Sequence, residues 1–187
     1  PKFSDAGRET YKTEIGRTVY GGGGILPDIE VEKPTTTETT ETLLNSDAFF
    51  NYVTNYFYEN TTIAEPSKFE LNDTDFNSLK KYLSKNNDAF ETKTEAHFKE
   101  AKQKAISEHL DGSLDQTFTE LLDKIQLEKL KELDKNKEEI LHKLTEEIVK
   151  RYYYDEGVYM QKASFDTNII KAMSILNNNE AYNSILK

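Results

Sequence analysis

The chain has 187 residues, with 24 Lys and Arg against 34 Asp and Glu, which gives a formal net charge of −10 at pH 7. This acidic balance argues against nucleic acid and against an anionic membrane surface as partners, because clustered Lys and Arg recognise both. No apolar run approaches the roughly 20 residues that a transmembrane helix needs. The absence of cysteine excludes disulfides, thiolate metal sites and cysteine nucleophiles.

Glycine and proline, the strongest breakers of regular structure, are concentrated near the N-terminus. Six of the eight glycines lie in residues 1–24, and the last of the four prolines is Pro66. From Ser67 onward only Gly112 and Gly157 interrupt the chain in this way. We therefore expect a short glycine-punctuated head followed by a long helical body.

The head predicts short β-strands. Residues 10–13 and 17–20 are β-prone runs separated by residues 14–16, a spacing typical of a hairpin or of two consecutive edge strands, and residues 29–32 alternate in the same way. A segment as short as residues 1–34 cannot bury such strands on both faces. We expect it to form the edge of a larger sheet, the terminal strands of a core that lies elsewhere.

Residues 35–45 are rich in Thr and Glu and contain no basic residue. This composition predicts a solvated linker between the head and the body.

Residues 46–187 predict a helical domain, so the fold class is mainly α: a bundle of about six to seven helices with a short N-terminal β segment. Ser46 has the place of an N-cap, and Ser113 with Gln116 forms a capping-box pattern. Gly112 and Gly157 are predicted to end helices. A break is expected at residues 134–137, and the Lys and Glu residues between 128 and 147 predict a solvated helix face.

No self-contained active site is visible. The Gly21–Gly24 run lacks the Lys-Ser/Thr of a phosphate-binding loop, and no serine is flanked by glycine as a nucleophile on a strained turn would be. Glu139 and His142 have the spacing found in carboxylate-bridged metal bundles, but such a site needs a second Glu-x-x-His and further Glu residues. We expect no catalytic residue, no metal and no other cofactor.

One aromatic cluster stands out near the end of a predicted helix. Tyr152, Tyr153 and Tyr154 follow Arg151 directly. Tyrosine is enriched at interfaces, which makes the three a candidate binding patch, but consecutive residues on a helix point in different directions and some are expected in the core.

Two motifs in the head carry a family resemblance. They read Tyr-x-Thr-x-x-Gly-Arg from Tyr11 and Gly-Ile-x-Pro-Asp-Ile from Gly24. Together they resemble the carboxy-terminal processing serine peptidases, also called tail-specific proteases, in the envelope-protein branch of Bacteroides-like bacteria. The matching residues, with a structural role implied, are Thr13, Gly16, Arg17, Gly24, Ile25, Pro27 and Asp28. The stretch from Arg151 to Gly157 is similar to the helical tail of the same branch.

The resemblance implies a role for the chain and a compartment. The family works with a Ser nucleophile and a Lys general base, and both precede the first motif, as does its PDZ module. We therefore expect a non-catalytic C-terminal region whose helices brace the protease core, shape substrate access or mediate oligomerisation. The implied partners are the rest of the parent peptidase, its polypeptide substrate and a second copy of the chain, in the periplasm or cell envelope.

Two alternatives stay open. The body can be an autonomous helical module that binds a peptide or a partner protein, which predicts an exposed aromatic groove near Tyr152–Tyr154. It can also be a metal-dependent enzyme built on Glu139 and His142, which predicts bound metal.

Overall fold

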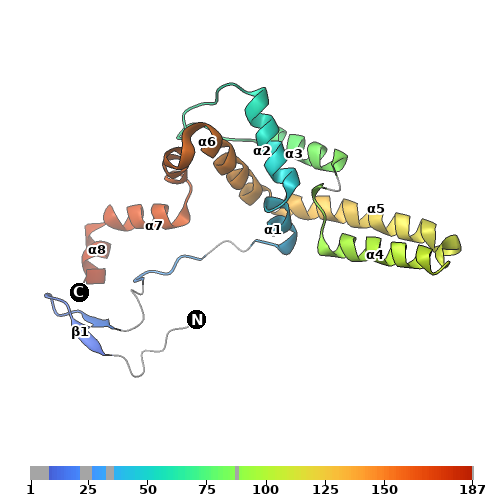
Figure 1. The fold of residues 1–187 in the computed structure, drawn as a ribbon. Coiled ribbons are helices and arrows are strands. Elements are labelled where there is room, and N and C mark those ends of the chain that lie inside the picture. Colours follow the sequence, from blue (N-terminus) through green and yellow to red (C-terminus); the bar gives the residue numbers. More distant parts are fainter. Residues whose placement is uncertain (1–8, 22–26, 33–35, 87–88, 187) are drawn as a thin grey trace. The chain divides into compact units, whose positions relative to one another are not determined.

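The computed structural model describes residues 9–21, 27–32, 36–86 and 89–186, with only the backbone of residue 111. The described residues form a mainly α structure with a small N-terminal sheet, as the sequence predicts (Figure 1). The chain divides into a larger unit of residues 35–162 and a smaller unit of residues 1–34 and 163–187. Helices of the larger unit are α1 (Glu38–Leu44), α2 (Asp47–Glu59), α3 (Asp73–Lys85), α4 (Lys93–Ser107), α5 (Asp111–Lys135) and α6 (Lys137–Lys162).

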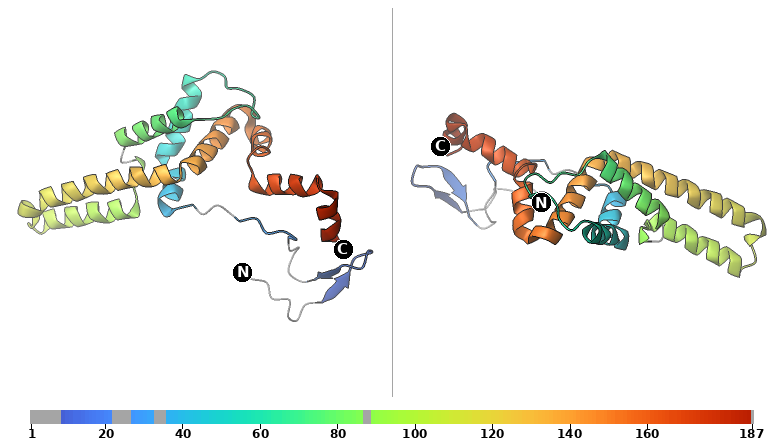
Figure 2. Two further views of the ribbon diagram at one scale, coloured as in Figure 1. Left: turned by 180° about the vertical axis from the view of Figure 1, so that it is seen from behind. Right: turned by 90° about the horizontal axis from the view of Figure 1, so that it is seen from above.

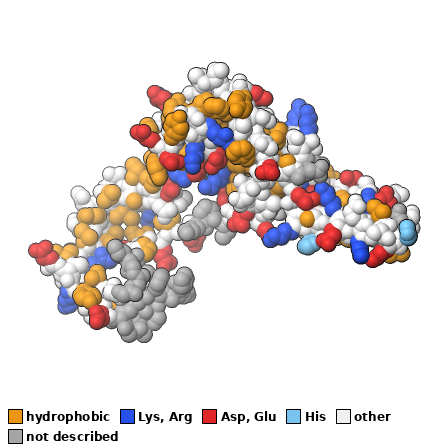
Figure 3. All heavy atoms as spheres, viewed as in Figure 1, with side chains coloured by type: hydrophobic (Ala, Val, Ile, Leu, Met, Phe, Trp, Pro, Cys, Tyr) orange, Lys and Arg blue, Asp and Glu red, His pale blue; other side chains and the backbone are white. Residues whose placement is uncertain are grey.

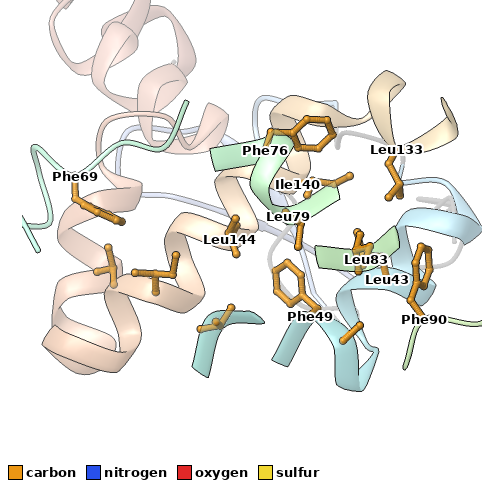
Figure 4. Packing of buried hydrophobic residues seen from close by; sticks show 14 of the residues in the cluster. Leu43, Phe49, Phe69, Phe76, Leu79, Leu83, Phe90, Leu133, Ile140 and Leu144 are labelled. Carbon is orange, nitrogen blue, oxygen red and sulfur yellow. The ribbon is translucent and has the colours of Figure 1, made fainter. Parts of the chain in front are cut away.

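The core of the larger unit lies where α1, α2 and α3 meet the junction of α5 with α6 (Figure 4). Leu133 and Ile140 lie on either side of that junction and are both completely buried. Asn136 caps the end of α5, so the break predicted at residues 134–137 is confirmed. Apolar side chains from all five helices surround the junction. Its buried members include Leu43, Phe49, Val53, Phe76, Leu79, Leu83, Leu144, Ile148 and Val149.

The segment expected as a solvated linker forms α1 instead. Thr37 begins this helix, its side chain accepting a hydrogen bond from the Thr40 amide at 3.3 Å. Thr40 and Leu43 are completely buried, while Glu38 and Glu41 face solvent. The acidic residues that suggested a linker lie on the outer face of the helix, while the opposite face, with Thr40 and Leu43, packs on the core and holds α1 in place.

Helix caps follow the sequence in one place and depart from it in another. Ser46 caps α2 as predicted, accepting from the Phe49 amide at 3.2 Å. At α5 the cap position is Leu110, which makes no side-chain cap bond, so the capping box predicted at Ser113 is wrong. The chain reverses at His109, whose φ of 60° is left-handed, and Gly112 lies inside the first turn of α5 rather than ending a helix.

The α4 and α5 helices lie side by side as a helical hairpin, which the views of Figures 1 and 2 both show. Its base is the buried end of α5. Its tip, where α4 turns into α5, carries Ile106, Leu110 and Leu114 exposed.

Helix α6 is kinked at Tyr154, where φ is 55° and ψ is −159°, and then continues to Lys162. Gly157 was expected to end this helix but lies within it, buried, just beyond the kink. A Cβ at Gly157 would stand 2.3 Å from Tyr153 Cβ, 3.2 Å from Val149 Cγ1 and 3.3 Å from Pro66 Cγ. Glycine is therefore required by close packing inside the kinked helix.

The smaller unit holds an antiparallel hairpin of β1 (Thr10–Lys12) and β2 (Thr18–Tyr20), with Tyr11 opposite Val19. This confirms the predicted hairpin, but residues 29–32 form no strand. Its helices are α7 (Thr167–Leu176), capped by Asp166, and α8 (Asn179–Leu186). Figure 3 shows hydrophobic side chains gathered over α7, and neither helix contains a buried residue. Among the described helices, none combines the length and apolar character needed to cross a bilayer.

Replacing Gly157 by Ala should destabilise the larger unit by about 1–3 kcal/mol, because the new methyl group overlaps Tyr153 Cβ within a packed core. Gly112 is a matched control, since it is also helical but a Cβ added there would have no atom within 4 Å. Gly112→Ala should leave the free energy of unfolding unchanged or raise it by up to about 1 kcal/mol. Urea unfolding followed by circular dichroism gives both values, and equal effects of the two substitutions would contradict the packing described.

Tyr52 should make the stability fall above pH 10. Burial, aided by the charge of Asp75, raises the pKa of Tyr52 from 10.0 to about 12. Between these values the unfolded chain loses the proton that the folded chain keeps, so the free energy of unfolding decreases as pH rises, by about 1–2 kcal/mol from this residue. Tyr52→Phe should remove that part of the loss, measured as the difference in unfolding free energy between pH 10 and pH 12. Tyr58→Phe, at an exposed position of the same helix, should leave the loss as in the unsubstituted chain.

Candidate interaction surface between α2 and α6

The hydroxyls of two serines in the helical body, Ser46 and Ser107, form hydrogen bonds at helix ends. Ser46 donates to the Leu43 carbonyl at 2.6 Å while capping α2, and Ser107 donates to the Lys104 carbonyl at 2.8 Å. Both follow the local pattern by which serine replaces backbone hydrogen bonds at helix ends. Ser46 is a cap and Ser107 is an exposed polar residue in the last turn of α4, the two roles that their sequence context predicts.

Glu139 and His142 lie in the first two turns of α6. The Glu139 carboxylate accepts a hydrogen bond from the hydroxyl of Thr36, which ties α6 to the segment before α1. His142 is exposed. Within the described ranges, no group of three or more His, Asp or Glu residues is placed to hold a metal ion. The contact of Glu139 thus has a structural purpose that needs no metal.

The motif residues of the head hold one another. In the turn between β1 and β2, the Thr13 amide donates to the Arg17 carbonyl at 2.9 Å and the Arg17 amide donates to Thr13 Oγ1 at 3.1 Å. Gly16 has a φ of +90°, a conformation that side chains rarely adopt. The Arg17 guanidinium forms an ion pair with Asp28, next to Pro27. The spacing of Thr13, Gly16 and Arg17 therefore fits a hydrogen-bonded turn, and Arg17 links this turn to Asp28 of the second motif through an ion pair.

Two other motif positions, Gly24 and Ile25, lie outside the described residues. The structural role expected for them stays a prediction.

The three consecutive tyrosines point to different places. The Tyr152 ring lies 4.9 Å from that of Phe57, and its hydroxyl donates to the carbonyl of Asn60. The Tyr153 hydroxyl lies 3.4 Å from the Ile63 carbonyl, and its ring packs on the core. Tyr154, at the kink, is 78% exposed. Two of the tyrosines fasten α6 to the chain that follows α2, and one faces solvent.

A cavity of about 200 Å³ lies beside Arg151, between α2 and α6. Its apolar lining includes Phe49 and Val53, which are buried, together with Leu44 and Phe50. Charged side chains from α6 complete the lining: Lys143, Glu147 and Arg151. These three stand at i, i+4 and i+8, so one face of α6 provides the charged wall.

The cations at this cavity differ in their partners. Lys143 forms an ion pair with Glu146 at 3.2 Å. Arg151 forms neither an ion pair nor a hydrogen bond with any residue in the described part of the chain. Its guanidinium carbon lies 4.7 Å from the centre of the Phe50 ring, a cation–π contact that holds the charge in place.

Exposed aromatic residues continue along the same side of α2. Phe50 is 58% exposed, and Phe57 and Tyr58 follow at i+7 and i+8 with their rings 5.8 Å apart. We call the cavity with Phe50, Phe57, Tyr58 and Arg151 the α2–α6 surface. Aromatic residues and arginine are the residue types that dominate binding energy at protein interfaces. A binding module predicts an exposed aromatic groove near Tyr152–Tyr154, and the exposed aromatic residues of this surface come from α2, with Phe57 beside Tyr152.

A buried ion pair between α4 and α5 was not predicted. Lys129 donates to both carboxylate oxygens of Glu95, at 2.7 and 2.9 Å, and to the Phe90 carbonyl at 2.7 Å. Glu95 also accepts from the amide and the hydroxyl of Thr92, both at 2.8 Å. The two charged side chains are only 2% and 8% exposed, and burial lowers the pKa of Lys129. Each of the three ammonium protons has an acceptor, so this pair is a structural clamp with no capacity left for a ligand.

The solvated helix face predicted for residues 128–147 is therefore wrong at Lys129. One signal was available: Ile125, Lys129 and Leu133 stand at i, i+4 and i+8, so the lysine occupies a register that is otherwise apolar. Charge alternation hid this register.

Comparison with known proteins identifies the domain. The family model described as "Probable PDZ-protease, C-terminal helical domain" matches residues 39–176, which reach from α1 to the end of α7. The chain belongs to this family. Neither the curated proteins nor the solved structures contain a significant match.

The PDZ-protease C-terminal helical domain thus includes the α4–α5 hairpin, the kinked α6 and the whole α2–α6 surface. The match confirms that the chain is the C-terminal portion of a protease, as the head motifs and the helical tail indicated.

Lys129→Met should destabilise the PDZ-protease helical domain by about 3–5 kcal/mol, because it leaves the Glu95 carboxylate buried without its cation. Adding Glu95→Gln removes that charge while keeping an oxygen acceptor for Thr92, and should restore much of the loss. Lys131→Met is the matched control: Lys131 lies on the same helix, paired with Glu128 in solvent, and its loss should cost less than about 0.5 kcal/mol. Urea unfolding measures all three, and an effect of Lys129→Met equal to that of Lys131→Met would show that the clamp is not buried.

Proposed function

We propose that this chain is the non-catalytic C-terminal region of a bacterial serine-type carboxy-terminal processing peptidase, whose peptide-bond hydrolysis is performed by another part of the parent protein. The family match over residues 39–176 carries this proposal. The head motifs support the more specific assignment to the tail-specific branch with a Ser–Lys pair. By the same resemblance, the compartment is the periplasm or the cell envelope.

The form of the hairpin supports its place in a peptidase core. Every residue of β1 and β2 is exposed, although Tyr11, Val19 and Tyr20 are large apolar side chains. A two-stranded hairpin has marginal stability alone and needs further strands or a packed face. The remaining sheet of the peptidase is the partner that would provide this cover.

The helical domain has the properties of a brace with one recognition surface. The α5–α6 junction and the Lys129–Glu95 clamp make α1–α6 a packed scaffold. The α2–α6 surface is the part of that scaffold with exposed aromatic side chains beside an unpaired cation. We propose that the scaffold supports the protease core and that the surface guides the polypeptide substrate.

An autonomous peptide-binding module is the second candidate. The α2–α6 surface favours it as well, because a surface that binds a peptide would do so with or without an attached protease.

The purified chain is expected to leave an unstructured protein intact, because hydrolysis is assigned to the parent's other half. Gel electrophoresis and mass spectrometry after prolonged incubation check this. In the parent, deletion of residues 38–176 should lower the cleavage rate for a long unstructured polypeptide more than for a short chromogenic peptide, since only the long substrate reaches the α2–α6 surface. Cleavage by the chain itself, free of contaminating protease, would refute the proposal.

A further inference from the structure

We propose that the α2–α6 surface binds an extended polypeptide segment in which a bulky apolar side chain stands next to an acidic residue. The apolar side chain enters the cavity between Phe49, Phe50 and Val53, and the acidic residue pairs with Arg151. This rests on the proposed function in one respect, that the ligand is a polypeptide.

The size of the cavity favours a single side chain over a small-molecule ligand. Sites for cofactors and drug-sized molecules occupy about 300–1,000 Å³, whereas this cavity has about 200 Å³. Its floor consists of two buried apolar side chains, Val53 at 1% and Phe49 at 4% exposed. The accessible apolar surface of the cavity includes the Phe50 ring, which is 58% exposed, so a bulky apolar side chain covers this ring without bringing a polar group that needs a partner.

The charge at the rim determines the neighbouring residue. Of the two cations that line the cavity, Arg151 has no carboxylate partner among the described residues, while Lys143 is already paired with Glu146. The Phe50 ring restrains the guanidinium at the cavity, so little side-chain freedom remains to be lost on binding. A carboxylate adjacent to the inserted side chain meets this guanidinium as a charge-assisted hydrogen bond.

Glu147 limits where that carboxylate can lie. It stands one helical turn before Arg151 and also lines the cavity, so an acidic residue on that side of the inserted side chain would be repelled. The rim therefore accepts a carboxylate toward Arg151 only.

Exposed aromatic residues extend the contact beyond the cavity. Phe57 and Tyr58 lie along α2 from Phe50 and offer ring faces to the residues that follow the inserted one. An extended segment can reach both, whereas a single small molecule in the cavity cannot.

Fluorescence anisotropy with the full chain and labelled Gly/Ser peptides, blocked at both ends, tests the proposal. One peptide has a central Phe-Asp pair, a second Phe-Lys and a third Ala-Asp. The Phe-Asp peptide should bind about three- to fivefold more tightly than Phe-Lys, as expected for one partly exposed ion pair, and more tightly than Ala-Asp because the cavity stays empty with Ala. The preference for Phe-Asp should weaken as salt is added.

Charge reversal at the rim gives the sharpest result. Arg151→Glu should invert the preference, so that Phe-Lys binds more tightly than Phe-Asp, which loss of folding alone would not produce. Lys150→Glu makes the same charge change at the adjacent position, where Lys150 is exposed and paired with Asp155, and should leave the preference for Phe-Asp as it was. Phe50→Ala should weaken binding of the Phe-Asp peptide. Tyr159→Ala, at an exposed aromatic residue that does not line the cavity, should leave this binding unchanged.

Three outcomes would overturn the inference. They are the absence of binding by the Phe-Asp peptide, equal affinity for Phe-Asp and Phe-Lys, and a preference unchanged by Arg151→Glu. Light scattering adds a fourth: a dimer abolished by Arg151→Glu and kept by Lys150→Glu would mean that a second copy occupies the surface. Failure of peptide binding leaves the expected lack of cleavage by the purified chain unaffected, so this inference can fail while the assignment as a non-catalytic region stands.

Discussion

The buried face of α6 is the constraint on which the larger unit depends. Ile140, Leu144 and Ile148 stand one turn apart and are at most 1% exposed, and α1, α2 and α5 all contact this helix. A fully buried side chain of this size contributes about 1.5–3 kcal/mol through removal from water. The same helix is kinked at Tyr154, and just beyond the kink Gly157 packs too closely on Tyr153, Val149 and Pro66 to leave room for a Cβ. Because α2 packs on α6, residues of these two helices and Leu44 of α1 together line the cavity beside Arg151.

Two cations, Lys129 and Arg151, differ in burial and therefore in the role that each can have. Lys129 is enclosed, and its ammonium donates all three of its hydrogen bonds to Glu95 and the Phe90 carbonyl, so it can only hold α4 to α5. Arg151 lies at a rim over the Phe50 ring, with no carboxylate partner in the described residues. Burying a charge without a partner costs a large free energy, whereas a charge at the rim stays hydrated and remains available to a ligand. The acidic net charge of the chain therefore says little about this site, because a single local cation decides it.

Much of the helical body could be predicted because its signals are local. The Ser46 cap, the break at residues 134–137 and the hairpin around Gly16 depend on residues a few positions apart. Local signals misled where contacts distant in sequence decide. The linker composition of residues 35–45 concealed α1, whose Leu43 enters a core built by other helices. Gly157 suggested a helix end, although close packing against Tyr153, Val149 and Pro66 requires glycine there.

The sequence by itself determined the helical character, the hairpin and, through the head motifs, the relationship to a protease, since each is written in short runs of residues. Only the tertiary structure decided which charges and aromatic rings matter. Lys129 and Lys131 belong to the same run of alternating charges, and although Lys129 stands in an apolar register, only the packed structure shows that it is enclosed and that Lys131 is solvated. Phe50 and Arg151 are a hundred positions apart and become neighbours only when α2 packs on α6. Burial and distance are properties of packed helices, and no local pattern contains them.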